Sequence, residues 1–159
     1  MSYAQLLSSV EIFADLNADQ IAKIESMSKV VVFRKGEVIF EENSPSNEFY
    51  IIVKGTVDIQ LDPDLIIREA DAHAPHTIVT LRRGQSFGEV ALVDQGVRSA
   101  SAISSARNCI VLMISRNDFM NLLQQDLEMG FIVMKNLASD LCFKIRNTNL
   151  MVREGLIAS

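Results

Sequence analysis

The residues best suited to chemistry are concentrated between Arg83 and Ser101. Arg98 supplies a permanent cation whose planar fork of donors can bind two oxygens of a phosphodiester together. Gly88 lets the backbone approach a ligand closely, and residues 90–93 can form one helical turn whose free N–H groups face an anion. Glu89 would repel phosphate unless it faced a hydroxyl, and a ribose 2′-OH meets that condition. The stretch therefore predicts a site for a sugar joined to a phosphate.

The order and spacing of these residues resemble a known family. The run Phe87-Gly88-Glu89-Val90-Ala91-Leu92, followed by Arg98-Ser99-Ala100, is similar to the phosphate-binding cassette of cyclic-nucleotide-binding domains. The resemblance implies that Glu89 binds the ribose 2′-OH, that Arg98 binds the cyclic phosphate, and that the backbone between them cradles the phosphate. The ligand-binding residues that it implies here are Phe87, Gly88, Glu89, Val90, Ala91, Arg98, Ser99 and Ala100.

The resemblance also bears on the choice of base. Ser99 looks like the small residue of cAMP-preferring members, whereas cGMP-preferring members more often have Thr there, so we expect cAMP before cGMP. By analogy with bacterial catabolite-activator-like regulators, Thr148 or Asn149 falls where a polar group meets the adenine amine. Thr148 is equally consistent with a plain polar position in a helix seam.

The elements that must position this segment follow from the hydrophobic periodicity. Residues 1–29 predict two short helices, the second beginning at Ala18 and capped by Asn17. Residues 30–114 predict a β-roll that contains the cassette at 86–101, and Gly36, Gly55 and Gly84 mark its turns. The expected strands are Val30–Arg34, Val38–Phe40, Phe49–Val53, Thr56–Leu61, Ile78–Leu81, Ala100–Ile103 and Cys109–Ile114. Asp62 to His76 is expected to form a long, mobile loop.

This pattern agrees with the fold that the resemblance implies, which is mainly β: a β-roll of the jelly-roll type (double-stranded β-helix) with flanking helices. We expect one domain over residues 1–159. The C-terminal part, 115–155, predicts a short helix at Arg116–Gln125 capped by Ser115 and a long one from about Glu128 to Glu154. The long helix would extend roughly 40 Å, so its far end should leave the body.

The long helix carries apolar residues at coiled-coil spacing, which predicts a homodimer through it. The seam comprises Phe131, Met134, Ala138, Leu141, Ile145, Thr148 and Val152. A second stripe of Ile132, Val133, Leu137 and Phe143 can lie on the domain. The alternative is a monomer in which the helix folds back and buries all of this surface.

Composition narrows the remaining function classes. The net charge of −5 argues against DNA binding by this chain, which would need clustered Lys and Arg. Cys109 and Cys142 each lie in an apolar run and are expected to be buried thiols of a reducing compartment. No segment has the character of a membrane span or signal peptide, so we expect a cytoplasmic protein.

We therefore predict a regulatory sensor domain in signal transduction and not an enzyme. No catalytic residues are expected, because no nucleophile and base pair or nucleotide-hydrolysis loop stands out. No metal or cofactor is expected either, since His73 and His76 lie in the predicted loop around Pro75 and hold no fixed geometry. The alternatives are the sensor half of a transcription regulator without its helix-turn-helix, a ligand-free dimerisation module, and a relative with a different effector.

Overall fold

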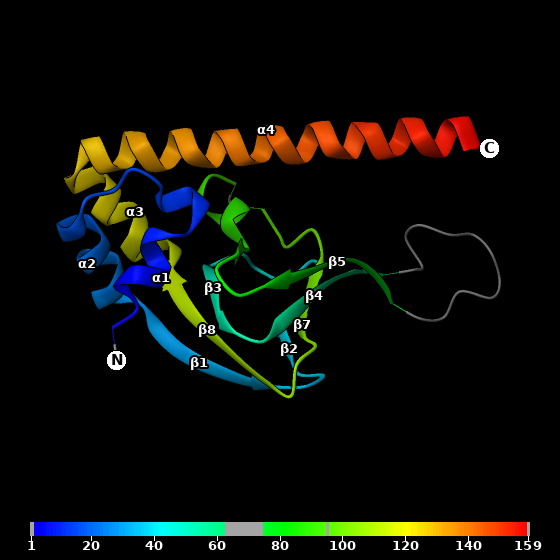
Figure 1. Cartoon of the computed structure of the whole chain (residues 1–159), viewed down its shortest axis with the longest axis horizontal. Coiled ribbons are helices and arrows are strands. Elements are labelled where there is room, and N and C mark those ends of the chain that lie inside the picture. The colour runs from blue at the N-terminus through cyan, green and yellow to red at the C-terminus, as the bar shows by residue number, and fades with distance from the viewer. Residues whose placement is uncertain (1, 63–74, 95, 159) are drawn as a thin grey trace.

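The alternation of apolar residues along the central strands builds two antiparallel sheets that enclose one core. The computed structural model describes residues 2–62, 75–94 and 96–158 (Figure 1). One sheet has the order β1-β8-β3-β6 and the other β2-β7-β4-β5. The strands are β1 (Lys29–Arg34), β2 (Val38–Phe40), β3 (Glu48–Lys54), β4 (Thr56–Leu61), β5 (His76–Arg82), β6 (Ser86–Phe87), β7 (Ser101–Ser104) and β8 (Asn108–Ser115).

Strand β3 is buried on both faces because it separates two apolar clusters. Successive side chains of a strand point to opposite faces, so Tyr50 and Ile52 lie between the sheets while Phe49 and Ile51 lie under the helices. β8 alternates in the same way, with Val111 on the inner side and Leu112 on the helical side. The roll and its helical cover therefore share the two central strands.

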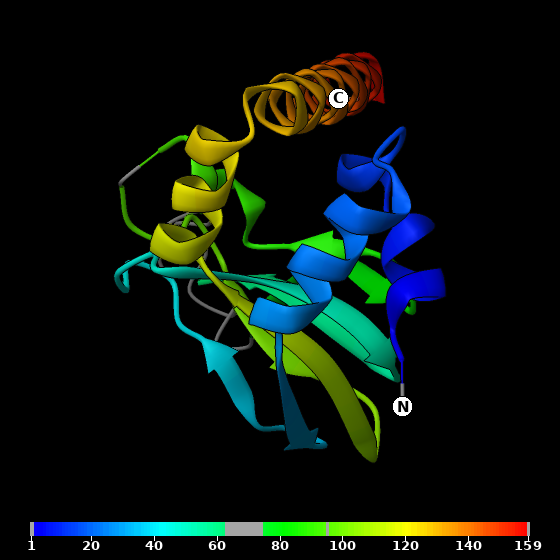
Figure 2. The same cartoon turned by 90° about the vertical axis from the view of Figure 1, so that its left-hand side faces the viewer.

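Helices α1, α2 and α3 gather at one end of the roll, and α4 runs from there across it (Figure 1). They are α1 (Ala4–Ser8), the 3₁₀ turn η1 (Glu11–Phe13), α2 (Ala18–Met27), the 3₁₀ turn η3 (Glu89–Leu92), α3 (Arg116–Gln125) and α4 (Leu127–Ala158). Figure 2 shows α2 and α3 below α4, which is seen nearly end-on. Phe13, Phe49 and Phe119 form a buried cluster of tilted rings between η1, β3 and α3. This cluster joins the helices to the first sheet.

The predicted helix starts are confirmed at the level of individual hydrogen bonds. The Asn17 side chain accepts from the Gln20 N–H at 2.9 Å, and the Gln20 side chain accepts in return from the Asn17 N–H at 3.0 Å. Ser115 caps α3 by accepting from the Asp118 N–H. Each cap satisfies backbone donors that the first helical turn leaves without partners.

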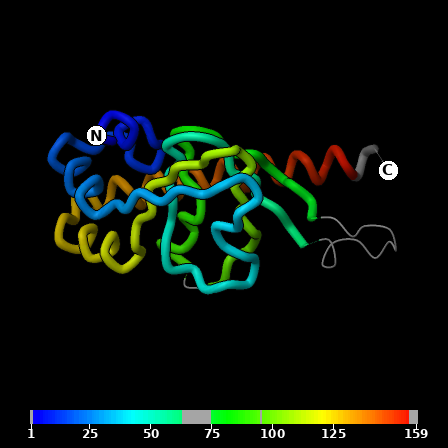
Figure 3. Tube along the Cα trace, turned by 90° about the horizontal axis from the view of Figure 1, so that it is seen from below, coloured from blue at the N-terminus to red at the C-terminus, as the bar shows by residue number. Residues whose placement is uncertain are grey.

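Helix α4 packs on the domain over its first half and is exposed from Thr148 to Gly155. Met129, Val133 and Leu137 are buried, and Asn136 donates to the carbonyl oxygens of Ile12 and Ala14. From Thr148 to Gly155 every side chain is exposed. In Figures 1 and 3 the C-terminal end of α4 extends away from the N-terminal helices, in the same direction as the β4–β5 hairpin. The expectation that the far end leaves the body is thus confirmed.

The structure corrects four expectations. β6 was not predicted, because two residues are too short to show a period. The expected loop Asp62–His76 ends earlier, since His76 already pairs with Leu61 as the first residue of β5; residues 63–74 of that loop lie outside the described residues. Cys109 is buried, but Cys142 is exposed, because it lies nine residues after the buried Val133 and therefore on the opposite side of α4. α4 also begins at Leu127 and continues to Ala158, beyond the predicted 128–154.

Candidate ligand-binding site

The cassette starts on strand β6, which fixes its first residues against the core. β6 pairs antiparallel with β3, bringing Phe87 opposite Tyr50. The two rings stack with centroids 5.1 Å apart and planes inclined by 16°. Phe87 is thus a packing residue of the inner core, and the chain reverses immediately after it.

The chain reverses at Gly88, whose backbone conformation is unfavourable for residues with a side chain. Its φ is +75°, in the left-handed region, and an added Cβ would lie 2.6 Å from Nη1 of Arg98. Glycine is therefore required here both by the backbone and by the arginine packed against it. The turn η3 follows directly and buries Ala91 and Leu92.

The turn η3 is connected to helix α3 through a side chain. Nε of Arg116, the first residue of α3, donates to the carbonyl oxygen of Ala91. The Arg116 N–H also donates to the Asn47 carbonyl at 2.9 Å. The cassette is therefore attached to both the roll and the helical cover.

Arg98 returns to Gly88 from the other end of the cassette. The residue is only 4% exposed, and its guanidinium lies 4.1 Å from the centre of the Phe40 ring. Nη2 donates to the Glu48 carbonyl at 2.6 Å and Nη1 to the Gly88 carbonyl at 3.3 Å. The Glu48 carboxylate lies 3.8 Å from Nη2. Nε is buried without a hydrogen-bond partner among the described residues.

Arg98 has one ion pair, at 3.8 Å with Glu48, and one buried donor, Nε, without a partner among the described residues. Burial lowers the pKa of Arg98, and the nearby Tyr50 and Glu48 offset this only in part. Arginine remains a cation at neutral pH even so. Because buried charges need compensation and buried donors need acceptors, the site favours an anion that brings oxygen acceptors.

The backbone of Arg98 is held by the loop between β2 and β3. The Asn43 N–H donates to the Arg98 carbonyl at 2.8 Å, and the Arg98 N–H donates to the Ser44 carbonyl at 2.9 Å. Pro45 and Val97 form a β-bridge beside them. These bonds fix where the arginine enters the core, although residues 96–100 have no regular structure.

Glu89 is the second buried charged group of the cassette, at 4% exposure. Its Oε1 forms an ion pair with Nζ of Lys144 on α4, and Lys144 also reaches Asp140 one turn earlier at 2.8 Å. Burial alone would lower the pKa of Lys144, but the Glu89 and Asp140 carboxylates together raise it. The site thus combines a buried cation and a buried anion on one short loop.

Lys144 is a site residue that the sequence reasoning missed. It lies seven residues after Leu137 and eleven after Val133, so helix geometry places it on the stripe that faces the domain. A lysine on such a stripe, four residues after Asp140, was the available signal.

Thr148 and Asn149, the predicted base contacts, form no side-chain hydrogen bond to the cassette among the described residues. Both are exposed, and the Thr148 hydroxyl donates to the Lys144 carbonyl at 2.9 Å on its own helix. Thr148 lies one turn beyond the helix residue that does reach Glu89. Within the cassette, Val90 and Ser99 are exposed, Ala100 is half-buried, and Phe87, Gly88, Glu89, Ala91 and Arg98 lie together.

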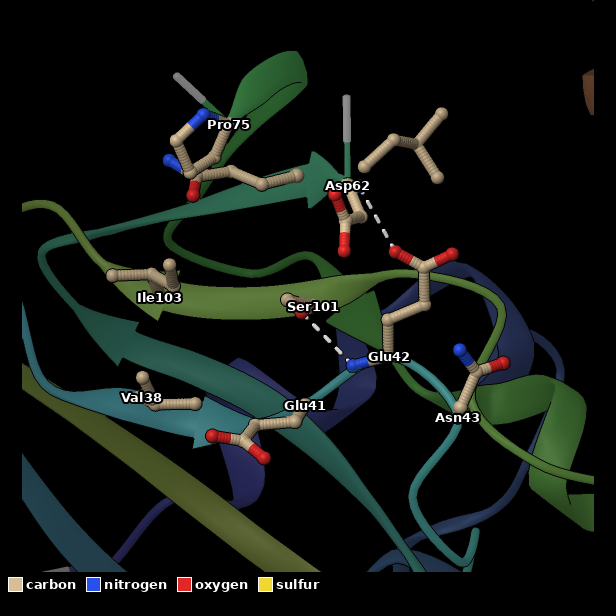
Figure 4. Close-up of a pocket in the computed structure, with 10 residues that line it drawn as sticks. Val38, Glu41, Glu42, Asn43, Asp62, Pro75, Ser101 and Ile103 are labelled. Carbon is tan, nitrogen blue, oxygen red and sulfur yellow. Dashed lines mark hydrogen bonds between the residues drawn. The ribbon is translucent and has the colours of Figure 1, made fainter. Parts of the chain in front are cut away.

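A separate cavity of about 450 Å³ lies on the second sheet, beside the end of the cassette (Figure 4). Its lining includes Glu41, Glu42 and Asp62 around Val38, Ser101 and Ile103. The Ser101 hydroxyl accepts from the Glu42 N–H at 2.9 Å. The described residues of this lining include three carboxylates and neither lysine nor arginine, a set that does not favour a phosphate.

The described part of the chain also bears on metals and membranes. It contains no group of three or more His, Cys, Asp and Glu side chains placed to hold a metal ion. Across residues 2–62, 75–94 and 96–158, no helix is both long and apolar enough to cross a membrane.

A β-roll whose cassette carries both a buried arginine and a buried glutamate defines a class of small-ligand-binding domain. The family profile described as "Cyclic nucleotide-binding domain" matches residues 30–126. The chain belongs to the cyclic nucleotide-binding domain family.

Relatives in sequence and structure agree with that assignment. The chain is 32% identical over 118 residues to human cGMP-dependent protein kinase 2, covering 74% of this chain and 15% of the kinase. The Thermus thermophilus catabolite activator protein superposes with a TM-score of 0.72 at 25% identity, covering 89% and 61% of the two chains. The regulatory domain of Toxoplasma gondii PKA, solved with cAMP, superposes with a TM-score of 0.71 at 23% identity, covering 89% and 49%. The mainly β fold with flanking helices is therefore confirmed.

Proposed function

We propose that this domain is a non-catalytic cAMP sensor, in which Arg98 binds the cyclic phosphate and Glu89 the ribose 2′-OH. The observation that carries the proposal is the Arg98 guanidinium, which is buried, cationic and left with an unpartnered Nε. A phosphate oxygen is the acceptor best matched to such a donor. Glu89 on the same loop supplies the complementary acceptor for a sugar hydroxyl.

The other cassette residues have supporting roles in this proposal. Phe87 anchors the loop in the core, Gly88 gives Arg98 room, and Ala91 keeps the turn η3 compact. Val90, Ser99 and Ala100 complete the lining, and the small Ser99 favours cAMP. The second candidate is cGMP, which the human relative, a cGMP-dependent protein kinase, supports. Thr148 and Asn149 remain the proposed contacts of the adenine amine, and Lys144 is a further helix residue to test.

We further propose that ligand changes the position of α4 and that α4 forms a homodimer. Phe131, Ile145 and Val152 of the expected seam are 69%, 60% and 55% exposed, while Met134 and Leu141 pack partly on the core. One face of the helix thus packs on the domain, and a second apolar face is uncovered. The helix therefore does not bury all of its apolar surface within one chain, and the uncovered face is the one available to a second chain. Cytoplasmic location and the absence of DNA binding by this chain remain predictions.

Calorimetric titration with cAMP and cGMP tests the ligand, after removal of any nucleotide that co-purifies. We expect saturable binding, tighter for cAMP. Arg98→Ala should weaken it at least tenfold, since a charge-assisted hydrogen bond contributes about 1.5–3 kcal/mol. Arg107→Ala, which removes an exposed arginine between β7 and β8, is the matched control and should bind like the parent.

The results separate the candidates. Tighter binding of cGMP would replace cAMP by the second candidate. An Arg98→Ala variant that binds as well as the parent would contradict the assignment of the phosphate site. No binding of either nucleotide by the parent would contradict the sensor proposal and favour a ligand-free module or a different effector.

A further inference from the structure

Helix α4 contacts the cassette at the Glu89 carboxylate, the group proposed to accept a hydrogen bond from the sugar hydroxyl. Lys144 reaches across from α4 to Oε1 of Glu89, and the lysine side chain is 52% exposed while the glutamate side chain is 5% exposed. Glu89 is enclosed by the roll, so the lysine covers the part of the carboxylate that faces outward. The ammonium and an incoming hydroxyl are therefore competitors for the same acceptor.

Loss of the ion pair would cost Glu89 more free energy than it would cost Lys144. A buried carboxylate without a partner is strongly destabilising, so Glu89 must keep either the lysine or a replacement donor. Lys144, by contrast, is half-exposed and has a second carboxylate, Asp140, at 2.8 Å on its own helix. When a ligand hydroxyl binds Glu89, Lys144 can remain paired with Asp140. Both the glutamate and the lysine then still have a partner.

We propose that Lys144 is a latch: it occupies Glu89 in the empty domain and is displaced when the ligand hydroxyl binds there. The proposal rests on the function proposed above and names the residue that couples the site to α4. Within this coupling, Asp140 holds the lysine after displacement. Lys144 thereby sets ligand affinity, because each binding event must first break its contact with Glu89.

The position of Lys144 along α4 gives the latch a mechanical consequence. The helix is tied down by Val133, Leu137 and Asn136, all N-terminal to Lys144. Beyond it, side chains from Thr148 to Gly155 are exposed. Release of Lys144 therefore frees the exposed half of α4 while its first half stays packed.

Three variants test the latch. Lys144→Ala removes it, and Lys144→Arg keeps a cation of similar reach. Lys135→Ala removes an exposed lysine nine residues earlier, on the opposite side of the same helix, and is the matched control. Cyclic nucleotide affinity is measured by calorimetry for each. Hydrogen exchange of the amides of residues 144–155 is measured without ligand.

We expect Lys144→Ala to bind cyclic nucleotide about five- to thirtyfold more tightly, because the empty state loses a charge-assisted contact that binding no longer has to break. Its amides at 144–155 should exchange faster than those of the parent, whereas Lys144→Arg and Lys135→Ala should match the parent in both measurements. Equal or weaker binding by Lys144→Ala would overturn the latch, since the lysine would then assist the ligand or take no part.

The two proposals fail separately. A parent that binds but a Lys144→Ala variant with unchanged affinity would refute the latch and leave the sensor function intact. If the parent binds neither nucleotide, the exchange experiment still decides whether Lys144 holds α4: unchanged exchange in Lys144→Ala overturns the latch as well.

Discussion

Gly88 carries two constraints that can be separated by experiment. A left-handed φ costs a non-glycine residue about 1–2 kcal/mol. At Gly88 there is the added 2.6 Å approach of a new Cβ to the Arg98 guanidinium. Gly36, in the turn between β1 and β2, has a similar φ of +86° but no neighbour within 4 Å of an added Cβ. The pair therefore shares the backbone cost and differs in the contact with the arginine.

We predict that Gly88→Ala weakens cyclic nucleotide binding at least tenfold, because the new methyl group displaces Arg98. Gly36→Ala should lower the unfolding free energy by about 1–2 kcal/mol and leave binding unchanged. Urea denaturation and calorimetric titration of both variants measure the two effects. Equal nucleotide affinity in the two variants would show that the space beside Gly88 does not matter for the site.

Among the helices, α4 depends on a cap that also ties it to α2. Asp126 accepts from the Met129 N–H at 3.0 Å and from the Gln20 side chain at 3.2 Å. These two hydrogen bonds, the first being the larger cause, lower the pKa of Asp126. A carboxylate with a lowered pKa in the folded state stabilises above its unfolded pKa of about 3.9 and loses that contribution as the pH falls through its folded value.

We predict that Asp126→Ala has a lower melting temperature than the parent at pH 7, because α4 loses its cap. The deficit should shrink as the pH is lowered from about 4 to 2, where the parent carboxylate is protonated too. Asp126→Asn retains a cap and should lie between them at pH 7. Thermal unfolding followed by circular dichroism at several pH values measures this, and a deficit that stays constant in acid would contradict a role for the charge.

The same scale shows why sequence reasoning reached some elements and missed others. Asn17 and Ser115 are local signals, since a cap needs only the residues of its own turn, and both helices begin where those residues indicated. β6 is fixed by pairing with β3, more than thirty residues earlier, and has no pattern of its own. Helix caps could therefore be predicted from the sequence, whereas the pairing of strands distant in the chain could not.

The site residues likewise separate into those that local sequence predicts and those that depend on the packing of distant elements. The cassette could be predicted because Gly88, Glu89 and Arg98 lie close together in one loop. Which helix residue meets Glu89 depends on how α4 crosses the roll, and no local pattern around Lys144 records that crossing. Cys142 was misplaced for a related reason, because an apolar run on a helix spreads around all of its faces.

Considered as a whole molecule, the domain places its ligand contact and its free apolar surface on one helix. Phe131 and Val152 lie on either side of Lys144 along α4 and are 69% and 55% exposed. A partner that covers this face would therefore be sensitive to any movement of Lys144. The expected seam and the latch are adjacent faces of one element, so oligomeric state and ligand occupancy should influence one another through it.

The homodimer is tested by placing charges in the seam. We predict that the parent has the mass of two chains in light scattering after size exclusion, and that Phe131→Glu with Val152→Glu has the mass of one, because buried like charges oppose a symmetric contact. The matched control is Val30→Glu with Val32→Glu, which alters two exposed valines on β1 and should leave the mass at two chains. A parent of one chain at high protein concentration would contradict the dimer, and a seam variant that stays dimeric would assign the contact to another surface.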